Sequence, residues 1–202
     1  MTLWFATGNE HKYRELSAIL RGHQLRLPKE KGIDFDPDET GTSFLENALL
    51  KGRVLYQLVQ EPVIADDSGL CVDALGGRPG IYSARYSGPG GDGGNEKLSS
   101  EERNELLLQE LGDTDQRSAR FVCAMVLVLS EYRFFVVQET LEGTIVRQGR
   151  GAGGFGYDPL LYLKEWGKTV AELSENEKNT LSHRAKAAQR IMTWIDSLGE
   201  KF

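Results

Sequence analysis

Residues 62–70 read Pro-Val-Ile-Ala-Asp-Asp-Ser-Gly-Leu, a short apolar run that leads directly into two adjacent carboxylates. The apolar residues predict a buried strand over Val63–Asp66. One aspartate can cap the turn that a Ser-Gly pair favours, but the other gains nothing from a neighbouring like charge, which raises its pKa. A divalent cation would remove this repulsion, and ligands of α/β sheets bind where strands end. The stretch therefore predicts a metal-binding carboxylate pair at a strand end.

The chain before this strand predicts one more strand and two helices. Thr2–Thr7 is rich in β-branched and aromatic residues and predicts a strand, after which residues 10–20 have the apolar spacing of a helix. Ser43-Phe-Leu-Glu46 matches a capping box and predicts the start of a second helix. Two successive strand–loop–helix units favour an α/β sheet.

The second half of the chain predicts a hairpin and further helices. Ala119–Leu129 and Phe134–Ile145 are long β segments around a short turn, which is typical of an antiparallel hairpin. Glycine-rich Gly76–Gly94 predicts a long loop or flap. Serine N-caps predict three more helices: Ser99–Leu111, a short helix from Ser174, and Ser182–Gly199. We expect the parallel elements and the hairpin to form two lobes with a cleft between them.

The composition restricts the class of protein. Of 202 residues, 40% are hydrophobic and 27% are charged, which is ordinary for a soluble globular protein. No apolar run approaches the roughly 20 residues that span a bilayer, and no secretory signal pattern opens the chain. Cys71 and Cys123 lie among apolar neighbours, which favours thiols in a reducing cytoplasm over a disulfide. The net charge of −6 argues against nucleic acid as a partner but allows a small phosphorylated ligand.

Two motif matches fail on closer inspection. Gly149-Arg-Gly-Ala-Gly-Gly154 matches the dinucleotide pattern G-x-G-x-x-G, but Pro159 opposes the helix that such a site requires. Asp34-Phe-Asp-Pro-Asp38 resembles the start of a calcium loop, but it lacks the turn glycine and the bidentate glutamate. These segments therefore predict neither a dinucleotide site nor a calcium site.

Thr7-Gly-Asn-Glu-His-Lys12 lies between a predicted strand and a predicted helix, where it could bind phosphate. Gly8 would let the backbone approach a ligand, and the free N–H groups of a helix start attract an anion. Lys12 opposes the helix dipole in the first turn, so its position gains nothing structurally. A phosphate beside Lys12 would explain the cation; a solvated lysine at a turn is the alternative.

Further residues could complete a nucleotide site. Glu39 could add an oxygen ligand to the aspartate pair, and such hard ligands suit Mg²⁺, which keeps waters and substrate phosphates in its shell. Phe155 lies among glycines, where it could be a core residue of a turn or a surface on which a nucleobase stacks. Lys178, His183 and Arg184 lie near helix starts, again against the dipole, and the last two could donate to the polar edge of a base.

The motifs TGNEHK, DETG, ADDSGL, LGGRPGIYSARYSG, GGFGYDP and AELSENEKNTLSHR follow one another over nearly the whole chain. Together they resemble the inosine triphosphate pyrophosphatase family. The resemblance implies one domain over residues 1–202, with a two-lobed α/β fold, an elongated central mixed sheet flanked by helices, and a homodimer. It also implies Mg²⁺-dependent cleavage of ITP, dITP and XTP to the monophosphate and pyrophosphate, which removes these nucleotides from the pool.

The family resemblance also implies roles for individual residues. Asp67 would be the general base and, with Glu39, a Mg²⁺ ligand. The implied substrate contacts are Thr7, Gly8, Asn9, Glu10, His11, Lys12, Ser68, Phe155, Gly156, Tyr157, Asp158, Lys178, His183 and Arg184. Ala152 replaces an expected acidic residue and Gly52 an expected alanine, but neither lies in a motif.

Three other functions compete with this prediction. A nucleotide-binding regulator without turnover would need the lysines but not the carboxylate pair between them. A phosphomonoesterase with an aspartyl nucleophile would need two aspartates separated by one residue, whereas Asp66 and Asp67 are adjacent. A pyrophosphatase for pyrimidine or modified nucleotides remains a related alternative. Release of pyrophosphate from ITP separates the expected enzyme from a regulator, orthophosphate would indicate a phosphatase, and a nucleotide panel with Mg²⁺ addresses the related pyrophosphatase.

Overall fold

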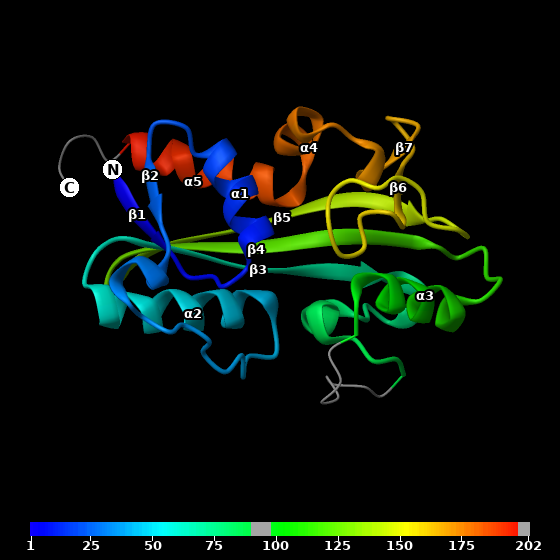
Figure 1. Ribbon diagram of the computed structural model, residues 1–202, viewed down its shortest axis with the longest axis horizontal. Helices are drawn as coiled ribbons and strands as arrows, with labels where there is room; N and C mark the ends of the chain where they lie inside the picture. The colour runs from blue at the N-terminus through cyan, green and yellow to red at the C-terminus, as the bar shows by residue number, and fades with distance from the viewer. Residues whose placement is uncertain (90–97, 198–202) are drawn as a thin grey trace. The chain divides into compact units, whose positions relative to one another are not determined.

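Seven strands form one mixed sheet in the order β2-β1-β3-β4-β5-β6-β7 (Figure 1). The computed structural model describes residues 1–89 and 98–197. β1 pairs in parallel with β2 and β3, while β6 pairs antiparallel with β5 and β7. The strands are β1 (Thr2–Phe5), β2 (Gln24–Arg26), β3 (Val63–Val72), β4 (Ser118–Ser130), β5 (Arg133–Ile145), β6 (Leu161–Leu163) and β7 (Lys168–Thr169). The predicted α/β class with a mixed sheet is confirmed.

The first helix begins after Asn9, and the other helices of the described residues begin directly after the predicted serine caps. They are α1 (Glu10–Ile19), α2 (Phe44–Val59), α3 (Ser100–Leu111), α4 (Glu175–Leu181) and α5 (His183–Ser197). Short 3₁₀ turns are η1 (Pro28–Lys31), η2 (Asp73–Leu75), η3 (Gly80–Arg85) and η4 (Val170–Glu172). The predicted flap thus contains η3, whereas its residues 90–94 and the predicted helix end at Gly199 lie outside the described residues.

The chain divides into two compact units, each built from separate segments. The first unit comprises Met1–Asp67, Cys123–Glu139 and Asn179–Phe202, and the second comprises Ser68–Val122 and Thr140–Lys178. Both units contain parts of β3, β4 and β5. The expectation that residues 1–202 act as one domain stays a prediction.

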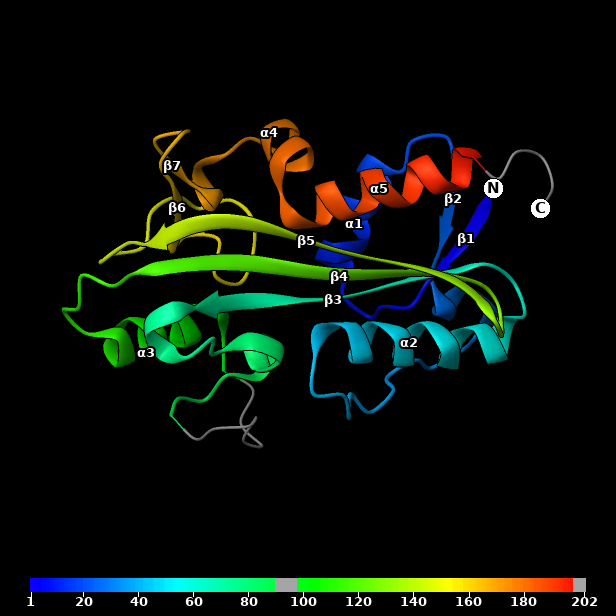
Figure 2. The ribbon, with the colours of Figure 1, turned by 180° about the vertical axis from the view of Figure 1, so that it is seen from behind.

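In the first unit, helices cover both faces of the sheet (Figures 1 and 2). Leu3 and Phe5 of β1 pack in one hydrophobic cluster with residues of α1 and α5, while Trp4 and Ala6 pack in a second cluster with α2. The same alternation places Ile64 of β3 in the first cluster and Ala65 in the second. This follows from the two-residue period of a strand, whose successive side chains point to opposite faces.

β3 is longer than the sequence pattern predicts. It begins at Val63 as expected, but it continues through the two aspartates to Val72. The prediction that the carboxylate pair closes a strand is therefore wrong. Asp66 and Asp67 lie inside a buried strand, and because consecutive residues alternate, their side chains point to opposite faces of the sheet.

The start of α2 differs in one detail from the predicted capping box. The Ser43 hydroxyl accepts a hydrogen bond from the Glu46 N–H at 3.2 Å, as expected of an N-cap. The Glu46 carboxylate, however, accepts hydrogen bonds from the N–H and hydroxyl of Thr42, at 2.6 and 2.9 Å. The reciprocal bond therefore forms one residue earlier in the chain than predicted.

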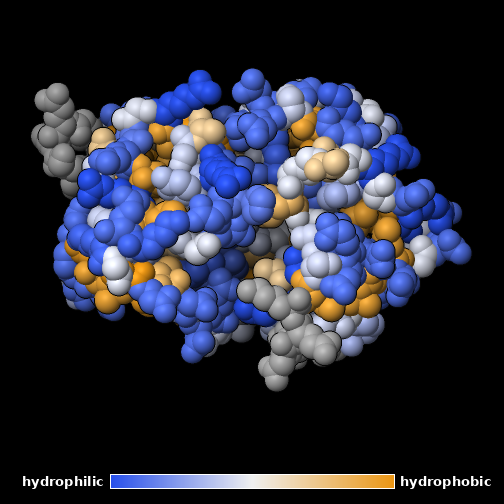
Figure 3. Space-filling model, in the orientation of Figure 1, coloured by the Kyte–Doolittle hydropathy of each residue, from blue (hydrophilic) through white to orange (hydrophobic). Residues whose placement is uncertain are grey.

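Hydrophilic residues cover most of the face shown in Figure 3. Among the described residues, the exposed large hydrophobic side chains are Leu45, Leu58, Tyr132, Phe134 and Trp166. Within residues 1–89 and 98–197, no helix combines the length and the apolar character that crossing a membrane requires.

Candidate active site

Asp66 is the centre of a buried ion cluster on the α1–α5 side of the first unit. The carboxylate Oδ2 lies 3.1 Å from Lys12 Nζ, and it accepts hydrogen bonds from Arg184 Nε and Nη2 at 3.2 Å each. Arg184 Nη1 lies 2.5 Å from the Glu15 carboxylate. Asp66 and Arg184 are each 1% exposed. Charges from β3, α1 and α5 therefore meet at one point, where Asp66 and Arg184 are buried and Lys12 and Glu15 are partly exposed.

The charges in this cluster stabilise one another. Burial by itself would raise the pKa of Asp66, but the charges of Lys12 and Arg184 outweigh it and hold the pKa below its ordinary value. Burial would likewise lower the pKa of Arg184, but Asp66 and Glu15 outweigh burial and raise it. Asp66 thus stays ionised as a counter-ion and does not exchange a proton near neutral pH.

This cluster corrects two inferences made from the sequence. Lys12 and Arg184 oppose the dipoles of their helices, but each is compensated by a buried carboxylate. Their positions therefore have a structural explanation that does not require a ligand. Asp66 and Asp67 also do not form one metal-binding pair, because only Asp67 faces α2.

Asp67 lies on the other face, among polar residues of α2 and the segment before it. Asp67 Oδ1 lies 3.2 Å from Lys51 Nζ, and that ammonium also lies 2.6 Å from Glu39 Oε1. Asp67 Oδ2 accepts a long hydrogen bond of 3.4 Å from the Asn47 amide. Burial raises the pKa of Asp67 above its usual value, although the charge of Lys51 opposes this shift. Asp67 is thus the carboxylate of the pair that is suited to accept a proton.

The residues around Asp67 fit a divalent cation. Glu39 and Asp67 converge on one ammonium, so their oxygens already share a position that favours positive charge. Across the described chain, no three His, Cys, Asp or Glu side chains are gathered as a metal site. Mg²⁺ does not need such a cage, because one or two carboxylates with waters and substrate phosphates usually suffice. Glu39 and Asp67 are therefore the residues that could hold it.

The backbone N–H groups of the turn before α1 have more hydrogen-bond partners within the protein than the sequence indicates. The Asn9 side chain accepts hydrogen bonds from the N–H groups of His11 and Lys12, at 2.9 and 3.2 Å, and the Thr7 hydroxyl accepts one from the Asn9 N–H at 3.1 Å. These N–H groups are therefore not open donors for an anion. A substrate contact here would rest on the backbone around Gly8 and on the Lys12 ammonium.

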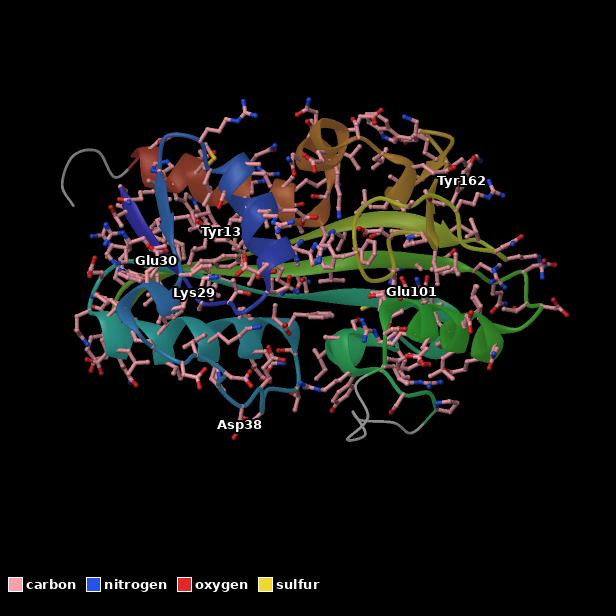
Figure 4. The ribbon with its side chains drawn as sticks, viewed as in Figure 1. Tyr13, Lys29, Glu30, Asp38, Glu101 and Tyr162 are labelled. Carbon is pink, nitrogen blue, oxygen red and sulfur yellow. The ribbon has the colours of Figure 1, made fainter. Side chains whose placement is uncertain are left out.

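Space remains in front of this turn. A pocket of about 150 Å³ is lined by Thr7, Gly8, Glu10, Leu27, Pro28, Lys29, Ile33, Asp34 and Phe35. Figure 4 shows Lys29 and Tyr13 on the elements that border it, while Asp38 points outward from the segment before α2. A Cβ placed on Gly8 would meet nothing within 4 Å, and Gly8 does not adopt a left-handed conformation. The fold itself therefore does not require glycine at this position.

The second unit contains the predicted aromatic loop, Phe155–Asp158. Asp158 Oδ2 accepts a hydrogen bond from the Phe155 N–H at 2.8 Å and another from Lys178 Nζ at 2.6 Å. The Lys178 ammonium also lies 4.8 Å from the centre of the Phe155 ring. Gly154 has a φ of +73°, and a Cβ there would lie 2.0 Å from Asp158 Oδ2, so this glycine is required. The loop therefore carries an aromatic ring and a cation in a fixed arrangement.

The remaining predicted residues occupy different environments. Glu10 is exposed and forms an ion pair of 2.5 Å with Lys29. His11 is exposed, whereas His183 is buried at the start of α5, after the Ser182 N-cap. Ser68 follows Asp67 in β3 and is partly buried. None of these environments by itself assigns a substrate contact.

Sequence reasoning missed two residues of the first unit that contact Asp67. Lys51 is 8% exposed on α2, and Asn47 is fully buried one turn earlier. Asn47 also accepts a hydrogen bond from the Gly41 N–H at 2.8 Å, so it connects the segment after Glu39 to Asp67. The available signal was a lysine and an asparagine on the apolar face of a helix, where neither is expected unless it is paired.

A model of the Ham1 family matches residues 3–194. The chain belongs to the Ham1 family. A relative from Treponema denticola named dITP/XTP pyrophosphatase is 49% identical over 195 residues, covering 96% of this chain and 98% of that protein. A relative of the same name from Geobacillus kaustophilus is 44% identical, covering 97% and 95%. The family expected from the motifs is thus confirmed.

Solved structures of Ham1 proteins have the same fold. The Staphylococcus aureus Ham1 protein matches with a TM-score of 0.86 at 38% identity, covering 98% of this chain and all of that one. A structure from Mycobacterium abscessus, titled nucleoside-triphosphatase and dITP/XTP pyrophosphatase, matches with a TM-score of 0.73 at 38% identity, covering 95% and 99%. The fold described above is therefore that of the Ham1 family.

We predict that Arg184→Ala destabilises this Ham1 chain by about 3–5 kcal/mol, because it removes a partner from a buried carboxylate. Arg190→Ala on the same helix is the matched control, since Arg190 is 70% exposed and pairs with Glu139 at the surface. Such a surface pair contributes about 0–1 kcal/mol. Urea unfolding of both variants measures the difference, and equal losses would contradict the role given to the buried cluster.

Proposed function

We propose that this chain hydrolyses non-standard purine nucleoside triphosphates, namely ITP, dITP and XTP, to the nucleoside monophosphate and pyrophosphate in the presence of Mg²⁺. The observation that carries the proposal is Asp67, a buried carboxylate of raised pKa that shares one ammonium with Glu39. Membership of the Ham1 family and the names of the relatives support the same reaction. The homodimer implied by the resemblance and the cytoplasmic location favoured by the cysteines stay predictions.

Asp67 supplies the general base in this proposal. An attacking water forms a bond to the α-phosphorus, the bond to the bridging oxygen breaks, and pyrophosphate leaves with the electron pair. Asp67 takes the proton of the water, and without a bound cation burial raises the pKa of this carboxyl. Bound Mg²⁺, held by Glu39 and Asp67, would supply charge neutralisation for the phosphates.

Lysine side chains supply the remaining positive charge. Lys51 lies between the two carboxylates, so it balances their charge when no cation is bound and could turn toward phosphate when one is. Lys12 is held by Asp66 with 14% of its side chain exposed, and it borders the turn around Gly8. Lys12, which Asp66 fixes before the substrate arrives, can stabilise the charge of the transition state without reorganisation.

The nucleobase would be recognised by the loop Phe155–Asp158 with Lys178, all of the second unit, while the substrate contacts expected of His183 and Arg184 stay predictions. The ring of Phe155 can stack on any purine, whereas a donor distinguishes the C6 oxygen of hypoxanthine from the amino group of adenine. Lys178 is a donor held beside the ring. Arg184 is fixed by Asp66 and Glu15, so any part it takes in recognition comes from a rigid position.

The direct test is a panel of ITP, dITP, XTP, ATP and GTP with the purified chain, with Mg²⁺ and with the metal removed by a chelator. We expect Mg²⁺-dependent release of pyrophosphate and monophosphate from the first three. Release of orthophosphate would indicate a phosphatase, and binding without turnover would indicate a regulator. Equal kcat/KM for ATP and ITP would contradict the proposed specificity.

We predict that Asp67→Asn keeps the fold but lowers kcat on ITP by about 10²–10⁴-fold, because an amide cannot accept the proton. The change is nearly isosteric, so the unfolding transition should move little. Asp66→Asn is the informative comparison, because Asp66 has two cationic partners and no proposed proton transfer. It should lower stability more than Asp67→Asn does. An Asp67→Asn variant with more than half of the wild-type kcat would rule out Asp67 as the base.

Gly8→Ala tests the phosphate turn without disturbing the fold. The added Cβ meets no atom within 4 Å, so the free energy of unfolding should change by less than about 0.5 kcal/mol. If substrate phosphates approach this backbone, the methyl group would displace them, and kcat/KM for ITP should fall about tenfold or more. Unchanged kcat/KM in a stable variant would place the phosphates elsewhere.

A further inference from the structure

The loop Phe155–Asp158 is held by hydrogen bonds from several parts of the second unit. Lys178 binds Asp158, and the Tyr157 hydroxyl donates to the carbonyl oxygen of Ser83 at 3.0 Å. Each of these contacts uses a side chain of the loop itself. The contact at the Gly156 carbonyl is different, because the backbone there is held by a side chain from another element.

That side chain belongs to Asn104 on α3. The Asn104 amide donates a hydrogen bond of 3.1 Å to the Gly156 carbonyl oxygen, across 52 residues of sequence. Gly156 has a φ of +62°, and as a glycine it has more conformational freedom than any residue around it. The bond from Asn104 therefore restrains the most flexible peptide of the loop, next to the ring of Phe155.

The amide oxygen of Asn104, in contrast, lowers the stability of the protein. Its Oδ1 atom is buried, and no residue of the described chain donates a hydrogen bond to it. A buried acceptor without a partner destabilises a protein, so the bond to the Gly156 carbonyl is made at the cost of an unpaired Oδ1. Asn104 is therefore better explained by the loop that it holds than by the stability of α3.

We propose that Asn104, which lies outside the motifs TGNEHK, ADDSGL, FGYDP and SHR, is a positioning residue for the nucleobase. This inference rests on the proposed function. Asn104 fixes the Gly156 peptide. It thereby keeps the Phe155 ring and the Lys178 ammonium in the positions from which they would contact a nucleobase. Without it, binding must order the loop, and that cost reduces the affinity for the base but not the affinity for the phosphates.

The test uses Asn104→Leu and Asn104→Asp, with Glu105→Ala as the control on the exposed side of the same helix. Leucine removes both the donor and the unpaired acceptor, while aspartate keeps the shape but opposes the Gly156 carbonyl with a negative charge. For each variant, inhibition of ITP hydrolysis by the two products, IMP and pyrophosphate, is measured along with kcat, KM and thermal unfolding.

In Asn104→Leu we expect the inhibition constant of IMP and the KM for ITP to rise about three- to tenfold, because the loss of one hydrogen bond weakens binding by about this factor. Both constants should rise further in Asn104→Asp. The inhibition constant of pyrophosphate and the kcat should stay within about twofold of wild type, as should every constant of Glu105→Ala. Amide hydrogen exchange over residues 154–158 should become faster in both variants, which gives a readout independent of turnover.

Three results would overturn the inference. The first is a wild-type inhibition constant for IMP in both variants. The second is a parallel loss of IMP and pyrophosphate affinity with a lower unfolding temperature, which is the pattern of general destabilisation. The third is a wild-type chain that neither hydrolyses ITP nor binds IMP in calorimetry, in which case the proposed function fails as well. If ITP is not hydrolysed but IMP binds, the same variants test Asn104 by their IMP affinity alone.

Discussion

The buried ion pair between Asp66 and Arg184 is the interaction on which the geometry of the first unit depends. It joins the middle of β3 to the start of α5, and Lys12 and Glu15 extend it to α1. Opposite charges without solvent stay together because separating them leaves each one unpaired in a medium of low dielectric. The helix starts are thereby fixed before any ligand arrives, which is the condition for electrostatic catalysis without reorganisation.

The neighbouring carboxylates of β3 show how one strand creates two environments. Asp66 meets two cations and keeps a lowered pKa, whereas Asp67 is buried against fewer compensating charges and has a raised pKa. Groups whose surroundings move their pKa values apart usually have different roles, and the proposed function gives Asp66 a structural role and Asp67 the role of base. The Lys51 ammonium compensates the buried charge of Asp67.

Local patterns predicted most of the fold, because serine caps, apolar spacing and the β4–β5 hairpin are encoded by residues close in sequence. They failed at β3, since two charges inside a strand look like its end. The residues that neutralise Asp66 are distant in sequence, since Arg184 lies 118 positions later, and no local pattern predicts them. Lys51 and Asn47 were missed for a similar reason, whereas the Phe155 loop was found because its glycines and aromatic residues are contiguous.

The alternation of side chains along β3 has a consequence for how this chain tolerates change in length. Inserting or deleting one residue between Val63 and Asp66 would turn every following side chain to the other face of the sheet. A deletion would place Asp67 where Asp66 now meets Lys12 and Arg184, whereas an insertion would place Asp66 where Asp67 now meets Lys51. Substitutions in this strand remove one interaction at a time, but a one-residue insertion or deletion would shift both carboxylates and leave only one of the two environments with a carboxylate.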